Sequence, residues 1–336
     1  NVRNGTIDLR TGELRGHRRE DWITKLLDIE YDPSATAPRW ERFLRESWPL
    51  ASIRDYLHRA AGYSATGSAR ERRMIVLHGI GRNGKGTFIK TLNAVLGAYA
   101  DRAPTEMLLA KTVSSIPSDV AKMRGLRLAY VSEVGEGRRL DEALVKDLTG
   151  GEDITARKLY GPWFTFRPTF TMWMLFNHKP IIRGTDRAIW DRLDLIPCDV
   201  RFRLPDEEDD GSPLADIGLD AALAEEHQGI LAWLVRGAAA WYQNGLGRPA
   251  EIRRATADYR TEMDLVGQFV DECVIEERGA KVRSRELFTA YVAWCKTVSE
   301  KEKSEKSFAL SLLERGCDKS KDRTGWWWVG MRLRTQ

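Results

Sequence analysis

The sequence has few cysteines and no long apolar run, and each shortage excludes a class of protein. Its 336 residues include four cysteines, Cys198, Cys273, Cys295 and Cys317, which form neither a CxxC nor a Cys/His spacing. That pattern argues against a structural zinc site and predicts a reducing compartment. No apolar stretch approaches the roughly 20 residues that span a bilayer, and the N-terminus has no signal-peptide pattern, so we expect a soluble protein.

The composition suits a large globular chain whose charge is unevenly placed. Hydrophobic residues make up 42% and charged residues 30%, which allows a sizeable core and two or three domains. The net charge is +4, yet residues 278–336 hold 14 Lys/Arg against seven Asp/Glu and carry +7. A basic C-terminal part indicates a polyanionic partner, although solvated lysines are the commoner cause of a charge run. Because the chain begins with Asn1 and not Met, we expect a piece of a longer protein.

A glycine-rich turn is the most informative feature. Residues 74–77 predict a short buried strand, and apolar residues at helical spacing over 88–96 predict a helix. Between them, Gly79, Gly84 and Lys85 match the phosphate-binding pattern GxxxxGK. Such a turn points backbone N–H groups at an anion beside the positive end of the following helix. The predicted nucleotide-binding residues are Gly79, Gly81, Arg82, Asn83, Gly84, Lys85, Gly86, Thr87 and Phe88.

The same turn also fits a second kind of nucleotide. Gly79, Gly81 and Gly84 satisfy the dinucleotide pattern GxGxxG, and Asp101 lies about where a ribose-binding acid is expected. A dinucleotide turn needs no lysine, whereas Lys85 would reach the β- and γ-phosphates of a triphosphate, so we favour ATP. A glycine-rich loop with an incidental lysine is the plain structural alternative.

Two positions are expected to serve Mg²⁺. Gly86 stands where Ser or Thr is usual, so the magnesium role passes to Thr87. Residues 126–131 predict a second buried strand, expected beside the phosphate loop, that ends in Ser132-Glu133. Glu133 is the candidate base for the attacking water and a candidate magnesium ligand, although a surface glutamate is the more frequent meaning of such a pattern.

Two further segments follow the second strand. Alternation around Tyr160-Gly161-Pro162 predicts a hairpin with Arg157, Lys158 and Tyr160 near its tip. A basic turn that merely faces solvent would look the same. Residues 169–176 are apolar on both faces, which is typical of a central parallel strand, and they end at Asn177.

The flanking parts predict a helical N-terminal region and a C-terminal module. Residues 4–14 predict a hairpin, and helical spacing occurs over 20–27, over 40–48 and from residue 53. Residues 203–216 predict a solvated loop, followed by helices over 219–243 and 249–263. From residue 265 the order is helix, short strand (280–282), helix (285–295), helix (306–315) and a strand pair within 326–333, which suggests a winged helix. The expected domains are 1–66, 67–264 and 265–336.

Six segments in a fixed order resemble a known family. They are NGTIDLRTGEL, GIGRNGKGTF, VSEVGEG, LVKDLTGGEDITAR, FNHKP and GTDRAIWDRLDLIP. Together they resemble the helicase part of phage and plasmid primase-helicases, related to the poxvirus primase-helicase and placed in superfamily 3 of the AAA+ class. The resemblance implies an α/β AAA+ P-loop core with a parallel sheet, a C-terminal winged-helix domain, a ring of six subunits with ATP between neighbours, and 3′ to 5′ movement on single-stranded DNA. It also implies an upstream primase-polymerase domain and work on forked DNA in the cytoplasm of a host cell.

The resemblance assigns roles residue by residue. Lys85 and Thr87 fall on the Walker A positions, Glu133 on Walker B, and Asn177 on the sensor that would hold the attacking water. Arg192 resembles the arginine finger that enters a neighbouring subunit's site, with Arg187 as the second choice.

Structural alternatives accompany the arginine and hairpin assignments. Surface salt bridges with Asp186 and Asp191 would also account for Arg187 and Arg192. In this family the hairpin points into a central channel, where Lys158 would contact DNA and Tyr160 would pack against a sugar or base. Arg157 would either join them or reach a γ-phosphate.

Two other functions fit part of the sequence. A small-molecule kinase also uses GKGT, but it needs an acceptor pocket and does not need Asn177 at a strand end or a basic tail. An ATP-binding initiator or assembly factor that does not unwind DNA fits Ser132, which stands where the family has an acid.

Overall fold

The protein is described here by a computed structural model that covers residues 1–110, 118–133, 135–184 and 186–334. Val134 and Thr185, which fall within two of the matched segments, lie outside these ranges. Contacts divide the chain into a first unit, Asn1–Ile182 with Ala188–Thr256, and a second unit, Arg183–Arg187 with the chain from Ala257 onward. Each unit is described by itself. The expected domain boundaries at 66/67 and 264/265 stay predictions.

A five-stranded parallel sheet forms the centre of the first unit. Its order is β4 (Ala100–Arg102), β5 (Leu128–Ser132), β8 (Thr171–Phe176), β3 (Met74–His78) and β9 (Leu193–Pro197). The three strands expected from apolar runs are confirmed, and β8 is buried at every position, as a central strand should be. One expectation is wrong: β5 does not neighbour β3, because β8 lies between them.

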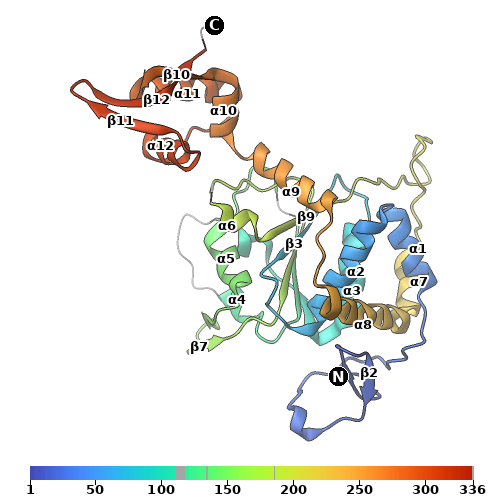
Figure 1. Cartoon of the computed structure of the whole chain (residues 1–336). Coiled ribbons are helices and arrows are strands. Elements are labelled where there is room, and N and C mark those ends of the chain that lie inside the picture. Colours follow the sequence, from blue (N-terminus) through green and yellow to red (C-terminus); the bar gives the residue numbers. More distant parts are fainter. Residues whose placement is uncertain (111–117, 134, 185, 335–336) are drawn as a thin grey trace. The chain divides into compact units, whose positions relative to one another are not determined.

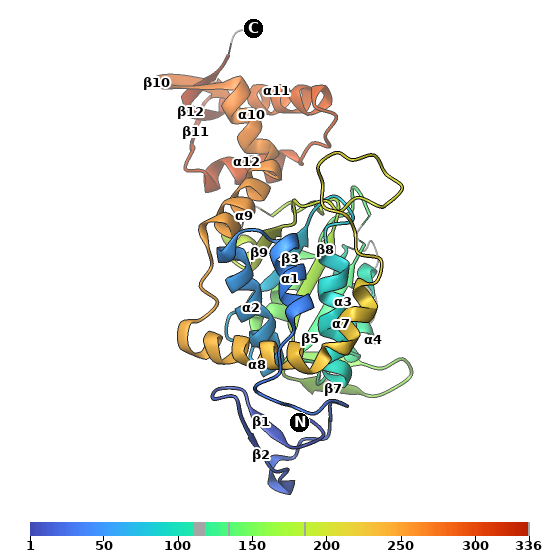
Figure 2. The ribbon, with the colours of Figure 1, turned by 90° about the vertical axis from the view of Figure 1, so that its right-hand side faces the viewer.

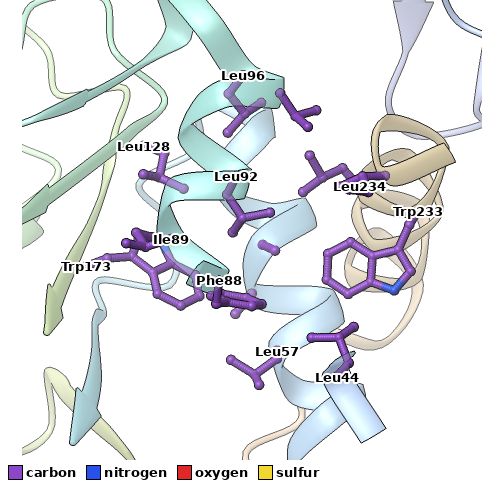
Figure 3. Packing of buried hydrophobic residues seen from close by; sticks show 14 of the residues in the cluster. Leu44, Leu57, Phe88, Ile89, Leu92, Leu96, Leu128, Trp173, Trp233 and Leu234 are labelled. Carbon is purple, nitrogen blue, oxygen red and sulfur yellow. The ribbon is translucent and has the colours of Figure 1, made fainter. Parts of the chain in front are cut away.

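Three long helices lie on one side of this sheet, the first two against it and the third packed on those two (Figures 1 and 2). They are α2 (Ala51–Thr66), α3 (Lys85–Leu96) and α8 (His227–Asn244), while α4 (Ser118–Ala121) and α5 (Glu142–Gly150) lie on the other side. Figure 3 shows Phe88 and Leu92 of α3 between Trp173 of the sheet and Trp233 of α8. Glycine lets α2 and α8 touch, since a Cβ on Gly62 would lie 2.1 Å from the Ala238 nitrogen.

The N-terminal region confirms one hairpin and two helices but not the first expected helix. β1 (Thr6–Asp8) and β2 (Glu13–Arg15) pair antiparallel, and α1 (Pro38–Ser47) precedes α2. A helix over 20–27 is wrong, since a short 3₁₀ turn, η1 (Arg19–Asp21), is followed by irregular chain. Trp22 ends that turn in the left-handed region (φ 52°) and is 83% exposed. Ile23 and Leu26 are also exposed and only Leu27 of this segment joins the core, so a helix here would have no continuous apolar face to bury.

The predicted helix over 219–243 is two helices, because Glu226 interrupts it. α7 (Leu219–Glu225) ends there and α8 begins at His227. The Glu226 carboxylate accepts the backbone N–H groups of Arg39 and Trp40, both at 2.9 Å, and so caps α1. A contact across almost 190 residues cannot be seen in a local pattern. The predicted loop over 203–216 is confirmed as irregular chain, and α9 (Ala250–Glu262) confirms the next helix.

The remaining elements of the central region are short. The predicted hairpin is confirmed as β6 (Ile154–Arg157) paired antiparallel with β7 (Trp163–Phe166). The others are η2 (Gly97–Tyr99), η3 (Thr105–Leu108) and α6 (Arg187–Trp190).

The second unit has its own core and a three-stranded antiparallel sheet in the order β10-β12-β11. Its elements are α10 (Leu265–Cys273), β10 (Val274–Arg283), α11 (Ser284–Thr297), α12 (Glu305–Glu314), β11 (Asp318–Asp322) and β12 (Gly325–Leu333). The helices agree with the prediction, and β10 is longer than expected. The expected strand pair within 326–333 is wrong: it is a single strand, paired with β11 and β10.

A buried ion-pair cluster ties β9 to the helices. Asp194, 1% exposed, lies 2.7 Å from Arg248 and 3.5 Å from Arg73, and it accepts a hydrogen bond from the Tyr56 hydroxyl. Asp194→Ala would leave two cations without their counter-charge, so we expect a loss of about 3 kcal/mol in the free energy of unfolding. Tyr56→Phe removes one hydrogen bond and should cost about 1 kcal/mol. Urea unfolding measures both, and equal stability of Asp194→Ala and the parent would contradict the cluster's role.

Candidate nucleotide site

A cleft of about 330 Å³ lies at the edge of the sheet where the parallel strands end. The turn after β3, the end of β5 and the end of β8 line it, so the segments that the sequence marked for chemistry meet there. The lining residues are Gly81, Arg82, Asn83, Gly84, Lys85, Gly86, Thr87, Lys90, Ser132, Glu133, Leu175, Phe176 and Asn177.

Lys85 is held inside the phosphate loop. Its ammonium group donates to the Gly79 carbonyl at 2.6 Å and to Oδ1 of Asn83 at 2.7 Å. Both acceptors are neutral, and burial lowers the pKa of Lys85. A cation with neutral partners, at the first turn of α3, presents positive charge and helix N–H groups to the cleft. This geometry suits a phosphate.

Neighbouring chain segments leave no room for side chains at two of the loop glycines. A Cβ on Gly79 would lie 2.2 Å from the Cys198 carbonyl oxygen, to which the Asn83 amide donates at 2.9 Å. Gly84 has φ 81°, and a Cβ there would lie 2.6 Å from Oγ of Ser47. Gly86, in contrast, faces open space. The loop is therefore anchored to the end of β9 and to α1, and it is open toward the cleft.

Glu133 and Thr87 face the same cleft. The Glu133 side chain is 84% exposed and lies 3.9 Å from the Arg102 guanidinium. Its backbone has φ 67° and donates to the Leu175 carbonyl of β8 at 3.2 Å, which positions the residue at the cleft edge. Within the described ranges no three His, Cys, Asp or Glu side chains cluster as a metal site. Mg²⁺ with a nucleotide needs one or two protein oxygens besides phosphates and water, so a hydroxyl and a carboxylate fit it.

Asn177 follows β8 and lies between the other candidates on the cleft wall. Two further lining residues are Ser132 and Lys90, and Lys90 was not predicted. It could have been found, because Gly86 and Lys90 are four residues apart and share one face of α3. Of the predicted nucleotide-binding residues, Phe88 is fully buried in the core instead. Phe88 packs in the core beneath the phosphate loop and does not line the cleft.

A second hollow of about 190 Å³ adjoins the phosphate loop. It shares Arg82, Gly84 and Thr87 with the cleft, and its other lining comes from α1, the 202–216 loop and α7. The apolar lining residues are Phe43, Phe202, Leu204, Leu214, Ala215 and Leu219. These residues come from three segments that are far apart in the sequence, so no local sequence pattern predicts the hollow.

The two candidate finger arginines are in different surroundings. Arg192 directly precedes β9, and its guanidinium donates to the Ala188 carbonyl at 2.8 Å. Since β9 runs parallel to β3, Arg192 lies at the opposite edge of the sheet from the phosphate loop, one five-residue strand or roughly 16 Å away. Arg187 is exposed and belongs to the second unit.

The tip of the β6–β7 hairpin carries polar and aromatic side chains. These residues are not among those that line the cleft. Tyr160 is 96% exposed with φ 59°, and Lys158 is exposed beside it. Arg157 is half-buried, with its guanidinium 5.2 Å from the centre of the Trp163 ring. Lys158 and Tyr160 are therefore the members of the predicted set that reach solvent at the tip.

Comparisons with known proteins find viral proteins named provisionally as helicases and primases. Residues 1–49 match the family described as "D5 N terminal like", and residues 77–192 match a family of unknown function, DUF5906. A protein of Acanthamoeba polyphaga mimivirus, named provisionally as helicase L207/L206, is 27% identical over 88% of this chain. A protein of African swine fever virus, named provisionally as primase C962R, is 24% identical over 88%.

These matches confirm the predicted resemblance. The chain covers 32% of the mimivirus protein and 33% of the African swine fever virus protein, so it spans about a third of the length of these relatives. Among solved structures, the C-terminal region of NrS-1 superposes with a TM-score of 0.56 over 90% of this chain and 78% of that one, at 10% identity. That likeness shows a shared fold. In the described part of the chain, no helix is both long and apolar enough to cross a membrane.

Gly79 is crowded and Gly86 faces open space, so alanine substitutions at these two positions form a matched pair of variants. Gly79→Ala forces the loop away from Cys198, so we expect nucleotide affinity to fall by at least roughly tenfold, about 1.4 kcal/mol. Gly86→Ala adds the same methyl group into open space and should keep the parent affinity within a factor of about three. Titration with a fluorescent ATP analogue measures both. Equal losses in the two variants would mean that crowding does not govern the loop.

Proposed function

We propose that this chain is the ATP-hydrolysing helicase part of a viral primase-helicase and acts on forked DNA. The observation that carries the proposal is the single cleft that gathers Lys85, Thr87, Glu133 and Asn177 from three separate strand ends. The viral relatives named as helicases and primases support it.

In this proposal each cleft residue acts on a different part of the triphosphate. Lys85 and the first turn of α3 neutralise the phosphate oxygens, while Glu133 orients and deprotonates the attacking water. Asn177 holds that water through its amide. Thr87 and Glu133 would hold Mg²⁺, which when bound screens the charge between the phosphates. Ser132 cannot supply the acid usual at its position, so both acidic roles fall to Glu133.

The adjoining hollow would take the base and ribose of ATP. Gly84 and Thr87, at the start of α3, line both this hollow and the cleft. The walls of the hollow are largely apolar. A flat base favours such walls, since binding there removes apolar surface from water. The D5-like N-terminal segment contributes Phe43 to this hollow and so takes part in nucleotide binding.

Assembly into a ring, which we propose to be hexameric, would complete the site. Arg192 lies at the far edge of the sheet from its own cleft, so it can serve only the cleft of another copy. To do so its guanidinium must leave the Ala188 carbonyl. Arg187, being exposed, is the alternative finger. Either guanidinium would stabilise charge on the transferred phosphoryl group and couple hydrolysis to the subunit interface.

DNA contact is proposed for the β6–β7 hairpin, with Lys158 on the phosphate backbone and Tyr160 on a sugar or base. Movement would run 3′ to 5′ along single-stranded DNA. The order of helices and strands in the second unit favours a winged-helix module. An upstream primase-polymerase domain would precede residue 1 in the full-length protein, which would work in the host cytoplasm.

Lys85→Ala tests the nucleotide role of the cleft. The variant removes the phosphate-facing ammonium, so we expect ATP hydrolysis to fall at least about a hundredfold while thermal melting stays unchanged. Strand displacement on a forked substrate should be lost with it. Parent protein that hydrolyses ATP and binds DNA but displaces no strand would favour the initiator function instead. Unchanged turnover in Lys85→Ala would rule out the phosphate-loop assignment.

Mixing two inactive variants tests whether an arginine acts between copies. In a 1:1 mixture of Lys85→Ala and Arg192→Ala, about a quarter of interfaces join an intact cradle to an intact arginine, so activity should return. A mixture of Lys85→Ala with Glu133→Gln is the matched control, because both changes damage the cradle side and no interface is complete. Rescue by Arg187→Ala in place of Arg192→Ala would assign the finger to Arg187. No rescue with either arginine variant would contradict a shared site.

A further inference from the structure

The second unit carries aromatic and basic side chains together on the β11–β12 hairpin. The register pairs Lys321 with Trp326 and Lys319 with Trp328, so these four residues share one face. Trp328 is fully buried in the core of the unit, whereas Trp326, two residues nearer the turn, is 50% exposed. One end of this face, at Trp328, is therefore part of the core, and the other end, at Trp326, is exposed to solvent.

Two lysines flank the exposed ring. The Lys319 ammonium lies 5.2 Å from the Trp326 ring centre and 5.1 Å from that of Trp328, and the Lys321 ammonium lies 5.6 Å from Trp326. The Lys319 ammonium thus makes a cation–π contact with both rings. Lys321 is exposed, so its charge is available to a partner.

The turn between the strands is preorganised and basic. Asp322 accepts the backbone N–H and the hydroxyl of Thr324, both at 2.7 Å, and these bonds lower the pKa of Asp322 to about 2. The Asp322 carboxylate is therefore engaged in hydrogen bonds within the turn. Residues 318–334 hold five Lys/Arg against two Asp/Glu, and Arg323 is exposed at the tip. A hairpin that presents a half-exposed indole beside two lysines suits a partner with both flat aromatic groups and negative charge.

We propose that Trp326 is a stacking site for an unpaired base of single-stranded DNA, with Lys321 and Arg323 on the adjacent phosphates. Nucleic acid alternates anionic and aromatic groups, which matches the charge and the ring on this hairpin. A duplex hides the faces of its bases, so the ring selects unpaired strand over paired DNA. The site lies wholly in the second unit and does not depend on ATP hydrolysis.

The contribution of the ring is measured with the full chain, without nucleotide, by fluorescence anisotropy on an oligo-dT strand. Trp326→Ala should weaken binding by about tenfold, and Trp326→Phe, which keeps a ring, by less than about threefold. Trp22→Ala is the matched control, since it removes an exposed tryptophan from the first unit. It should bind as the parent does. Binding by Trp326→Ala that equals the parent would overturn the proposal.

Further probes separate stacking from charge and from folding. On an abasic strand and on a closed circular duplex, Trp326→Ala and the parent should bind equally, because neither offers a base face to the ring. Lys321→Gln should lower the slope of log affinity against log salt by about 1 on every strand. Trp326→Leu keeps apolar bulk without a ring and should bind as weakly as Trp326→Ala. A loss of the same size on abasic or duplex DNA, or full affinity in Trp326→Leu, would show that the ring does not stack on a base. Because no nucleotide is present, failure of the proposed motor would leave these results unchanged.

Discussion

Parallel hydrogen bonding of β3, β5 and β8 is the constraint on which the site depends. Parallel strands end at one edge, so the turn after β3, Glu133 after β5 and Asn177 after β8 are brought to a common wall. The position of β8 between the other two sets the spacing: the phosphate loop and Glu133 are separated by one strand, and Asn177 lies between them. That gap leaves room for phosphates between cation and carboxylate.

The phosphate loop is held from outside the sheet as well. Gly79 touches the chain after β9, and Gly84 touches Ser47 and Phe43 of α1. The same α1 is capped by Glu226, which joins the N-terminal region to the α7–α8 corner. The N-terminal region therefore does more than precede the nucleotide core. It forms one wall of the hollow beside the loop and fixes the conformation in which Lys85 faces the cleft.

Charge in this chain is used differently in its two units. In the first unit the important cations are held by neutral or buried partners: Lys85 by two loop oxygens, and Arg248 and Arg73 by Asp194. These arrangements hold a cation at a fixed position. In the second unit, lysines and arginines lie at the surface beside tryptophans, where they can meet a partner.

The sequence by itself determined the buried strands, the glycine turn with its lysine, the hairpin tip and the helices of the C-terminal part, because each is set by local periodicity or by residues close together in the chain. Tertiary structure alone decided what depends on distant contacts. The interruption at Glu226 serves the capping of α1, and the 20–27 segment leaves most of its apolar residues exposed and buries only Leu27. The strand order, the hollow beside the phosphate loop and the exposure of Trp326 arise only when segments far apart in the chain are packed together, since no short window of sequence records which surfaces will meet.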